Sequence, residues 1–427
     1  MAKQRPTGLG VICLAVFLDL VGFSILFPLF ADLMVYYGDS GLLQRLMSWV
    51  AIWLPEAGAD QRAALFGGIL LGLYSVLQFI AAPLWGRLSD RIGRRRVLLI
   101  TVAGNTLGYL LWIVADSFLL LVLSRLICGL SAGNISVASA AVADVTTQEN
   151  RTKGMGFLGM AFGFGFLFGP VIGGLSASSI DGLMPSGGLA WNPFSLAATV
   201  AAGLSLVNVI WIWRRFAETR HRRTDAGGQE PLGPGSRRLV LINLIFVISF
   251  AAMESTLVFL AFGQLHYHAA DMVGIFLTLG LCNAAVQGGV VRRLAPRLGA
   301  KRLAFIGLLL LMPSYACLAL LASLPAGSGA WLLYLGVAGL GLGSGFTMPS
   351  LSALVSLLAP ADGQGAAMGR FRSAGALGRA IGPFCGALLF FLIDPAAPYW
   401  SGGAAFLLPL LLLVGIRPPS TTTGGDD

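Results

Sequence analysis

Four ionisable side chains lie inside long apolar runs of this 427-residue chain: Asp19, Arg125, Glu254 and Arg379. A charge at the centre of a bilayer costs about 2.5–3.5 kcal/mol on insertion scales, so each group should face a wet cavity or another charge. Two acids against two arginines predict pairing. An aspartate whose partner moves away can load and release a proton. We therefore interpret Asp19, which lies about ten residues or roughly 15 Å into its run, as a proton site.

The other three charges admit more than one role. Glu254 is either a second acid in proton transfer or the binder of a cationic substrate. Arg125 cannot deprotonate, so it sets the local field and carries no proton. Arg379 can attract an anionic substrate or neutralise an acid. For both acids, a fixed structural ion pair is the alternative.

The stretch "GRLSDRIGRRR" (residues 86–96) holds one aspartate among five arginines. Asp90 should stay ionised there and seek particular partners. Asp144, at the end of a later apolar run, comes within reach of Arg94 if the intervening helices pack together. The alternative is that the loop is only a topology anchor, with its arginines holding the orientation of the chain in the membrane.

A second group of residues is uncharged. Gly165, Gly169 and Gly173 recur every four residues, with Pro170 and Gly174 beside them. Such a stripe lets another helix approach closely, and a proline bends its helix, so close packing is one explanation. Polar neutral side chains that can line a cavity are Gln78, Asn105, Asn134, Asn283 and Gln287.

The composition identifies the elements that must position these residues. The chain is 56% hydrophobic and 11% charged, against about 25% charged in soluble domains. Apolar runs long enough to cross a bilayer core of about 30 Å recur along it. We predict an all-α polytopic membrane protein. The five cysteines have no paired spacing, and no metal set, nucleophile elbow or phosphate loop is found. We therefore expect no enzyme, no metal and no cofactor.

We predict twelve transmembrane helices. They cover roughly 9–31, 64–84, 97–117, 118–142, 154–178, 194–213, 239–262, 272–291, 303–323, 329–358, 367–393 and 400–417. With the N-terminus inside, all of the 28 Lys and Arg except Arg45, Arg62, Arg125 and Arg379 fall on the inner side. This asymmetry predicts a multi-pass protein of the inner or plasma membrane with both termini cytoplasmic. The net charge of +9 therefore does not indicate nucleic acid.

The spans divide into two halves. Residues 217–238 form a polar linker between bundles at 1–216 and 239–417, followed by a tail at 418–427. Residues 86–100 align without gaps with 292–306, so that Gly93 matches Gly299, and "GPVIGG" (169–174) is echoed by "GPFCGA" (382–387). Two six-helix bundles in parallel repeat place a substrate near the midplane between them. The exterior segment 32–63 is expected to carry an interfacial helix.

Together these motifs resemble the major facilitator superfamily. Residues 86–96 resemble its signature loop, "SRLICGLSAGN" (124–134) its second motif, and "GFLFGPVIGG" (165–174) its antiporter motif. "LDLVGFSILFP" (18–28) resembles the drug:proton antiporter pattern. The resemblance is strongest to the tetracycline-pump and tetracycline-transporter-like group. It implies the major facilitator fold.

The resemblance also implies roles. Gly86, Asp90, Arg91, Gly93, Arg94 and Asp144 would form a gating network that latches the halves near the start of span eleven in the outward-facing state. Arg125 would take part in a proton relay, and the glycine motif would favour exchange over uniport. Bacterial tetracycline pumps carry an acid in span nine and a histidine in span eight. This chain has no acid at 303–323 and has Asn283 at the histidine position, so the resemblance implies the mechanism rather than the drug.

Three functions remain open on the sequence. The first is proton-coupled export of small amphipathic organic molecules by alternating access, with the substrate, protons and the lipid bilayer as partners of a monomer. The second is a facilitator or proton symporter for an organic anion or metabolite. The third, from another class, is a non-transporting membrane sensor or scaffold. Collapsing a proton gradient in vesicles separates the first two.

Overall fold

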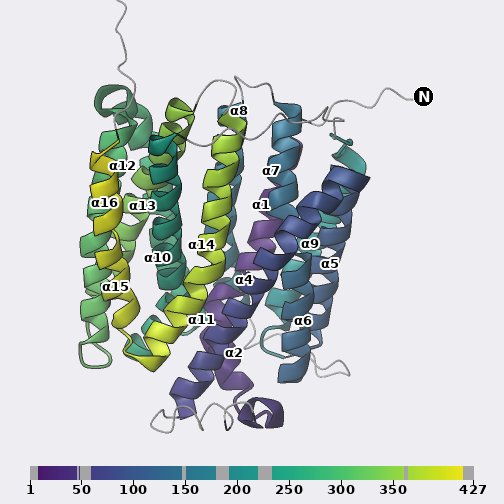
Figure 1. The fold of residues 1–427 in the computed structure, drawn as a ribbon. Helices are drawn as coiled ribbons and strands as arrows, with labels where there is room; N and C mark the ends of the chain where they lie inside the picture. The colour runs from purple at the N-terminus through teal and green to yellow at the C-terminus, as the bar shows by residue number, and fades with distance from the viewer. Residues whose placement is uncertain are drawn as a thin grey trace, which may run out of the picture.

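The computed structural model describes residues 8–45, 48, 59–146, 151–178, 192–219, 233–359 and 364–416. Within these ranges all regular structure is helical (Figure 1), which satisfies every backbone polar group inside its own segment, as a bilayer demands. Eleven helices among the described residues are long and apolar enough to cross a membrane. A further helix, α4 (Ala59–Ile92), occupies the expected second span. The all-α membrane class is confirmed.

The chain before the linker forms one group of helices, which we call the first half. They are α1 (Leu9–Ser24), η1 (Phe27–Leu29), α2 (Phe30–Tyr36), α4, α5 (Arg94–Ile113), α6 (Phe118–Ser131), α7 (Asn134–Val145), α8 (Arg151–Ser178) and α9 (Ser195–Arg215). Its large buried side chains include Trp112, which is fully enclosed.

The second half contains the remaining helices. They are α10 (Pro234–Leu265), α11 (Ala269–Ala285), the π-helix η3 (Val286–Val290), α12 (Val291–Ala322), α13 (Ala330–Leu358), α14 (Gln364–Leu392), α15 (Ala397–Ala405) and α16 (Leu407–Val414). Tyr315 and Tyr399 are fully buried in its core. In Figure 1 most of this half lies at the left and most of the first half at the right, while α4, α8, α11 and α14 lie between. Contacts of α4 with α14 and of α8 with α11 join the halves.

Two spans of the first half are interrupted. The first span tightens to a 3₁₀ turn at Phe27–Leu29, where Pro28 lacks a backbone N–H, and then continues to Tyr36, beyond the expected end at 31. The fourth span breaks between α6 and α7, where Ala132 leaves helical geometry with ψ 49°. Discontinuous helices near the midplane are where transporters place ion and substrate sites.

Gly93 and Gly299, which the repeat aligns, share a feature of the backbone. Both have positive φ, 104° and 74°, a conformation that glycine adopts without steric cost. Gly93 separates α4 from α5, and Gly299 kinks α12 at the corresponding place in the second half. The internal repeat therefore extends from the sequence to the backbone.

Some expectations concern chain segments at the edges of the description. Helix α10 begins at Pro234, within the segment 217–238 that we expected to be linker, because Pro234 suits the first turn of a helix. Most of that linker (220–232) and the tail 418–427 lie outside the described residues. So do residues 46–47 and 49–58 of the expected exterior helix.

Candidate functional site

A cavity lies between the two halves, and both contribute to its lining. Its empty volume is about 870 Å³, which includes space open to solvent. The first half supplies Asp19, Tyr74, Gln78 and Asn134, and the second half supplies Glu254, Ser255 and Arg379. Three of the four charges predicted from the sequence therefore meet at one cavity, together with two of the predicted polar residues.

Asp19 on α1 is held by two amides. Its Oδ1 accepts hydrogen bonds from Asn134 Nδ2 at 2.8 Å and from Asn105 Nδ2 at 2.9 Å. Both asparagines are more than nine-tenths buried, on α7 and α5. Charge-assisted hydrogen bonds of this kind are stronger than neutral ones. Three different helices therefore converge on one carboxylate.

The break in the fourth span brings Asn134 to this position. Helix α6 ends at Ser131 and α7 begins at Asn134 itself. The N-terminus of a helix carries a partial positive charge, so the start of α7 favours an anion beside it. Gly133 is required at the break, because a Cβ there would lie 2.4 Å from Trp85 Cδ1.

Arg125 on α6 lies deeper in the first half and is 3% exposed. Its Nη2 donates to Ser124 Oγ at 2.8 Å, and its guanidinium stands 4.8 Å from the ring centroid of Trp112 and 5.8 Å from that of Tyr109. Stacking of a cation on aromatic faces is favourable, more so when both are desolvated. Arg125 is thus buried against a hydroxyl and two aromatic rings and does not line the cavity.

The expected pairing of Asp19 with an arginine is wrong. The ion pairs between described residues place Arg94 with Asp90 and Asp144, and His268 with Asp32, and Asp19 takes part in none of them. Asparagine amides occupy its oxygen instead. Neutral donors stabilise a carboxylate without adding a second charge to the bilayer interior, where each charge is costly.

In the second half, Glu254 on α10 and Arg379 on α14 line the same side of the cavity. Their charges interact electrostatically. Helix α10 packs closely on α14, so these two side chains belong to the second half, whereas Asp19 belongs to the first.

Aromatic side chains form the apolar wall, and all of them come from the first half. Phe23 stacks on Tyr74 with centroids 4.6 Å apart and meets Phe166 edge-on at 6.0 Å. Phe27 and Phe30 complete the wall. Apolar walls with a few placed polar groups are typical of sites for small organic ligands. No sequence pattern distinguishes these phenylalanines, because aromatic residues are scattered through every span.

Asn283 lies elsewhere and does not line the cavity. Its Nδ2 donates to Ser344 Oγ at 2.8 Å, and its Oδ1 accepts from Gln287 Nε2 at 2.6 Å. These contacts join α11 and η3 to α13. The interpretation of Asn283 as a cavity residue is therefore wrong, because its face of α11 is turned toward α13.

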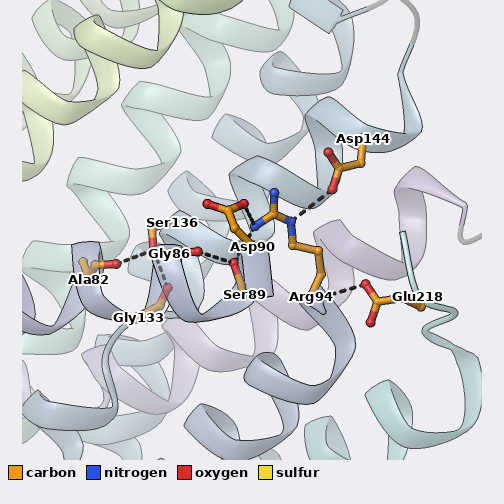
Figure 2. Close-up of polar contacts among 9 residues, drawn as sticks. All are labelled: Ala82, Gly86, Ser89, Asp90, Arg94, Gly133, Ser136, Asp144 and Glu218. Carbon is orange, nitrogen blue, oxygen red and sulfur yellow. Dashed lines mark hydrogen bonds and ion pairs between the residues drawn. The ribbon is translucent and has the colours of Figure 1, made fainter. Parts of the chain in front are cut away.

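The segment 86–96, which we expected to be a loop, is the end of α4, Gly93 and the start of α5. It carries the predicted charge network (Figure 2). Arg94 Nη1 lies 2.6 Å from Asp90 Oδ1, and Arg94 Nε lies 3.0 Å from Asp144 Oδ2. Arg91 is exposed. Gly86 faces α7, and a Cβ built on it would lie 4.0 Å from Ser136 Oγ. The structure thus brings Arg94 and Asp144 together as anticipated. The ion pair of Asp90 stays within the first half.

The glycine stripe of α8 divides between two partners. A Cβ at Gly165 or Gly169 would lie 2.6 or 1.9 Å from a side-chain atom of α1, and one at Gly173 would lie 2.1 Å from the carbonyl oxygen of Ile25, just after α1. A Cβ at Gly174 would instead lie 2.5 Å from Ala269 O of α11. Pro170 lies inside α8 on the buried side. The matching segment of the second half, residues 382–387, is also closely packed, because Gly382 and Gly386 lie against the backbone of α10.

The Gly174 contact belongs to a seam at the end of the molecule that carries α2. There Oδ2 of Asp32 on α2 accepts a hydrogen bond from Ala269 N at 2.9 Å, and its Oδ1 lies 2.8 Å from His268 Nδ1. An acid of the first half thus caps α11 of the second. The side chain of His268 is 66% exposed, so the contact lies at the surface of the molecule, and no sequence motif predicts it.

Comparisons with known proteins agree with this arrangement. The family model of the Major Facilitator Superfamily matches residues 12–383 and 290–426. Major facilitator superfamily domain-containing protein 10 of Mus musculus is 31% identical over 445 residues, covering 97% of this chain and 93% of that protein. Tetracycline resistance protein, class B, of Escherichia coli is 30% identical over 376 residues, covering 84% and 88%.

A solved structure shares the arrangement as well. The crystal structure of the human organic anion transporter MFSD10 (TETRAN) superposes with a TM-score of 0.73 at 29% identity, covering 95% of this chain and 98% of that one. These relatives are transporters and not enzymes. The chain is a multi-pass membrane transporter that belongs to the major facilitator superfamily.

Proposed function

We propose that this chain is a proton-coupled antiporter that exports small amphipathic organic compounds by alternating access. One observation carries the proposal: a cavity between the halves has Asp19 on one wall and Glu254 and Arg379 on the other. If a proton and a substrate compete for these charged residues, they would be exchanged across the membrane as the two halves rock. The names of the tetracycline resistance relatives agree with export.

The conformation of the molecule supports alternating access. At the α2 end the halves are joined by Asp32 with His268 and Ala269, and by Gly174 with Ala269. We infer that this end is the outer one, because the basic loops lie at the other. On this inference the state is closed toward the outside, both termini are cytoplasmic, and we place the chain in the inner or plasma membrane.

We also propose how the chain is divided into moving parts. The division into bundles at 1–216 and 239–417, joined by a linker at 217–238, is the unit of rocking, with the helical start at Pro234 attached to the second bundle. Asp19, Glu254 and Arg379 all belong to a single chain, so we propose a monomer as the working unit. Arg125 contributes a fixed positive charge behind Asp19.

Transport of an organic anion is the second candidate. Arg379 is the positively charged residue in the cavity lining, opposite an aromatic wall, and a flat anion could lie between them. Human MFSD10, whose crystal structure superposes on this chain, is named an organic anion transporter. Substrate charge therefore distinguishes the two candidates.

The experiment uses purified protein in liposomes, with ethidium as a planar cation, fluorescein as a planar anion and tetracycline. We expect an imposed proton gradient to drive accumulation of at least one probe, and collapse of the gradient to abolish it. Accumulation of fluorescein alone selects the anion candidate. Equilibration of a probe that ignores the gradient contradicts antiport, and no movement of any probe contradicts the substrate class.

A further inference from the structure

Glu218, just after α9, caps a helix from outside that helix. Its Oε1 accepts a hydrogen bond from Arg94 N at 2.8 Å, and its Oε2 accepts one from Arg95 N at 3.3 Å. The first N–H groups of a helix have no partner within it, and Gly93 at the N-cap position has no side chain to offer. Three arginines lie in the first turn of α5, where the helix dipole is already positive, so a nearby carboxylate is stabilising there.

Gly93 provides the space for that carboxylate. A Cβ at Gly93 would lie 2.2 Å from Glu218 Oε2, and the φ of 104° already disfavours any other residue. Gly299, the repeat partner of Gly93, has the same kind of backbone, but nothing lies within 4 Å of its Cβ position. Among the described residues, a docked carboxylate is therefore found in the first half alone.

The segment that carries Glu218 is itself anchored. Phe216, 2% exposed, packs in the core cluster of Ile12 and Leu98, and Thr219 is 4% exposed. Arg95 Nη2 donates to Trp213 O at 2.5 Å. Residues 216–219 thus form a strap from the end of α9 to the start of α5, and the linker between the halves leaves from this strap.

Arg94 receives both sets of contacts. Glu218 holds its backbone, while Asp90, Asp144 and Ser89 hold its guanidinium, the last at 2.5 Å (Figure 2). We propose that Glu218 is a positioning residue of the gating loop: it orients Arg94 for its two acids and couples the linker to the loop. This role rests on the proposed alternating access, and it gives Gly93 a second reason to be glycine besides its positive φ.

The test measures which side of the membrane reaches the cavity. A single cysteine is placed at Ser255, a lining residue, after replacement of the five native cysteines. Its reaction with a membrane-impermeant maleimide is then timed from each side in oriented proteoliposomes. This readout needs neither a substrate nor a proton gradient. Thermal melting of each variant controls for folding.

Loss of the Glu218 contact should weaken the loop and favour access from the loop end. We expect Glu218→Gln and Gly93→Ala each to shift the ratio of the two rates by about five-fold, the low end of a typical coupling between sites, and their combination to shift it no further. Gly299→Ala strains its backbone equally but displaces no carboxylate, and Ser117→Ala removes a helix cap elsewhere in the first half. Both should leave the ratio unchanged.

Two results would overturn the assignment alone: an unchanged ratio in Glu218→Gln, or a shift in Gly299→Ala as large as that in Gly93→Ala. A third result reaches further. If the cysteine at position 255 in the parent protein reacts from one side only under all conditions, including an imposed proton gradient with each probe, alternating access itself fails and the role of Glu218 with it.

Discussion

Asp32 of α2 and His268 just before α11 are in polar contact across the two halves, with 2.8 Å between Asp32 Oδ1 and His268 Nδ1. The other oxygen of Asp32 caps α11 through Ala269 N. Phe262 meets the His268 ring edge-on at 5.6 Å between centroids. One carboxylate therefore makes both a side-chain contact and a helix cap at the α2 end.

Replacing Asp32 with Asn should loosen this end. The variant loses the charge of the pair and one charge-assisted contact to the cap, together about 1 kcal/mol, so the reaction of the cysteine at position 255 from the α2 side should rise about five-fold. Asp39→Asn is the matched control, since Asp39 is an exposed acid seven residues away. Equal rates in both variants would mean that the pair does not hold the seam.

The amides around Asp19 should matter for transport more than for folding. Asn134→Leu removes a 2.8 Å donor from Asp19 and leaves it only the Asn105 amide. It should lower proton-driven transport at least ten-fold, because a hydrogen bond to a charged group contributes about 1.5–3 kcal/mol. Asn208→Leu removes a buried amide that binds Ala15 O at 2.8 Å on another face of α1. It should lower the melting temperature but keep coupling to the gradient.

Initial rates of probe uptake, normalised to inserted protein, provide the measurement for the two asparagines. If both variants lose the same share of activity and stability, the Asn134 amide has only a structural role.

The α8 stripe predicts a contrast between two glycines. Gly169→Ala puts a methyl group 1.9 Å from Ser24 Oγ and 2.7 Å from Val21 O, and overpacking of this kind costs about 1–3 kcal/mol. At Gly163 nothing lies within 4 Å, so Gly163→Ala should be neutral or stabilising by about 0.5–1 kcal/mol. Melting curves in detergent compare the two. A Gly169→Ala protein as stable as the parent would show that α1 and α8 do not pack this closely.

Part of the architecture could be predicted because the bilayer leaves few alternatives. The apolar runs predicted the positions of the spans. Because a charge in lipid is costly, Asp19, Glu254 and Arg379 could be predicted as functional residues, and all three line the cavity. The pairing of Arg94 with Asp144 followed from two charges forced to the same end of neighbouring helices. Glycine spacing located the close contact of α8 with α1.

Other features depend on facing and register, which a single sequence does not contain. Composition could not show that Asp19 would take amides in place of an arginine, nor that Asn283 would turn toward α13. The contact of Asp32 with His268 depends on how the two halves meet, and the dock of Glu218 depends on the path of the chain after α9. Each pair is more than a hundred residues apart in sequence.

Direct measurement of proton release tests the central idea that one titrating carboxylate links the two fluxes. Solubilised protein in weak buffer with a pH indicator receives the probe that the liposome assay selects. We predict proton release from the parent protein and none from Asp19→Asn, with binding of the probe retained in both. Equal release from the variant would contradict the coupling role of Asp19.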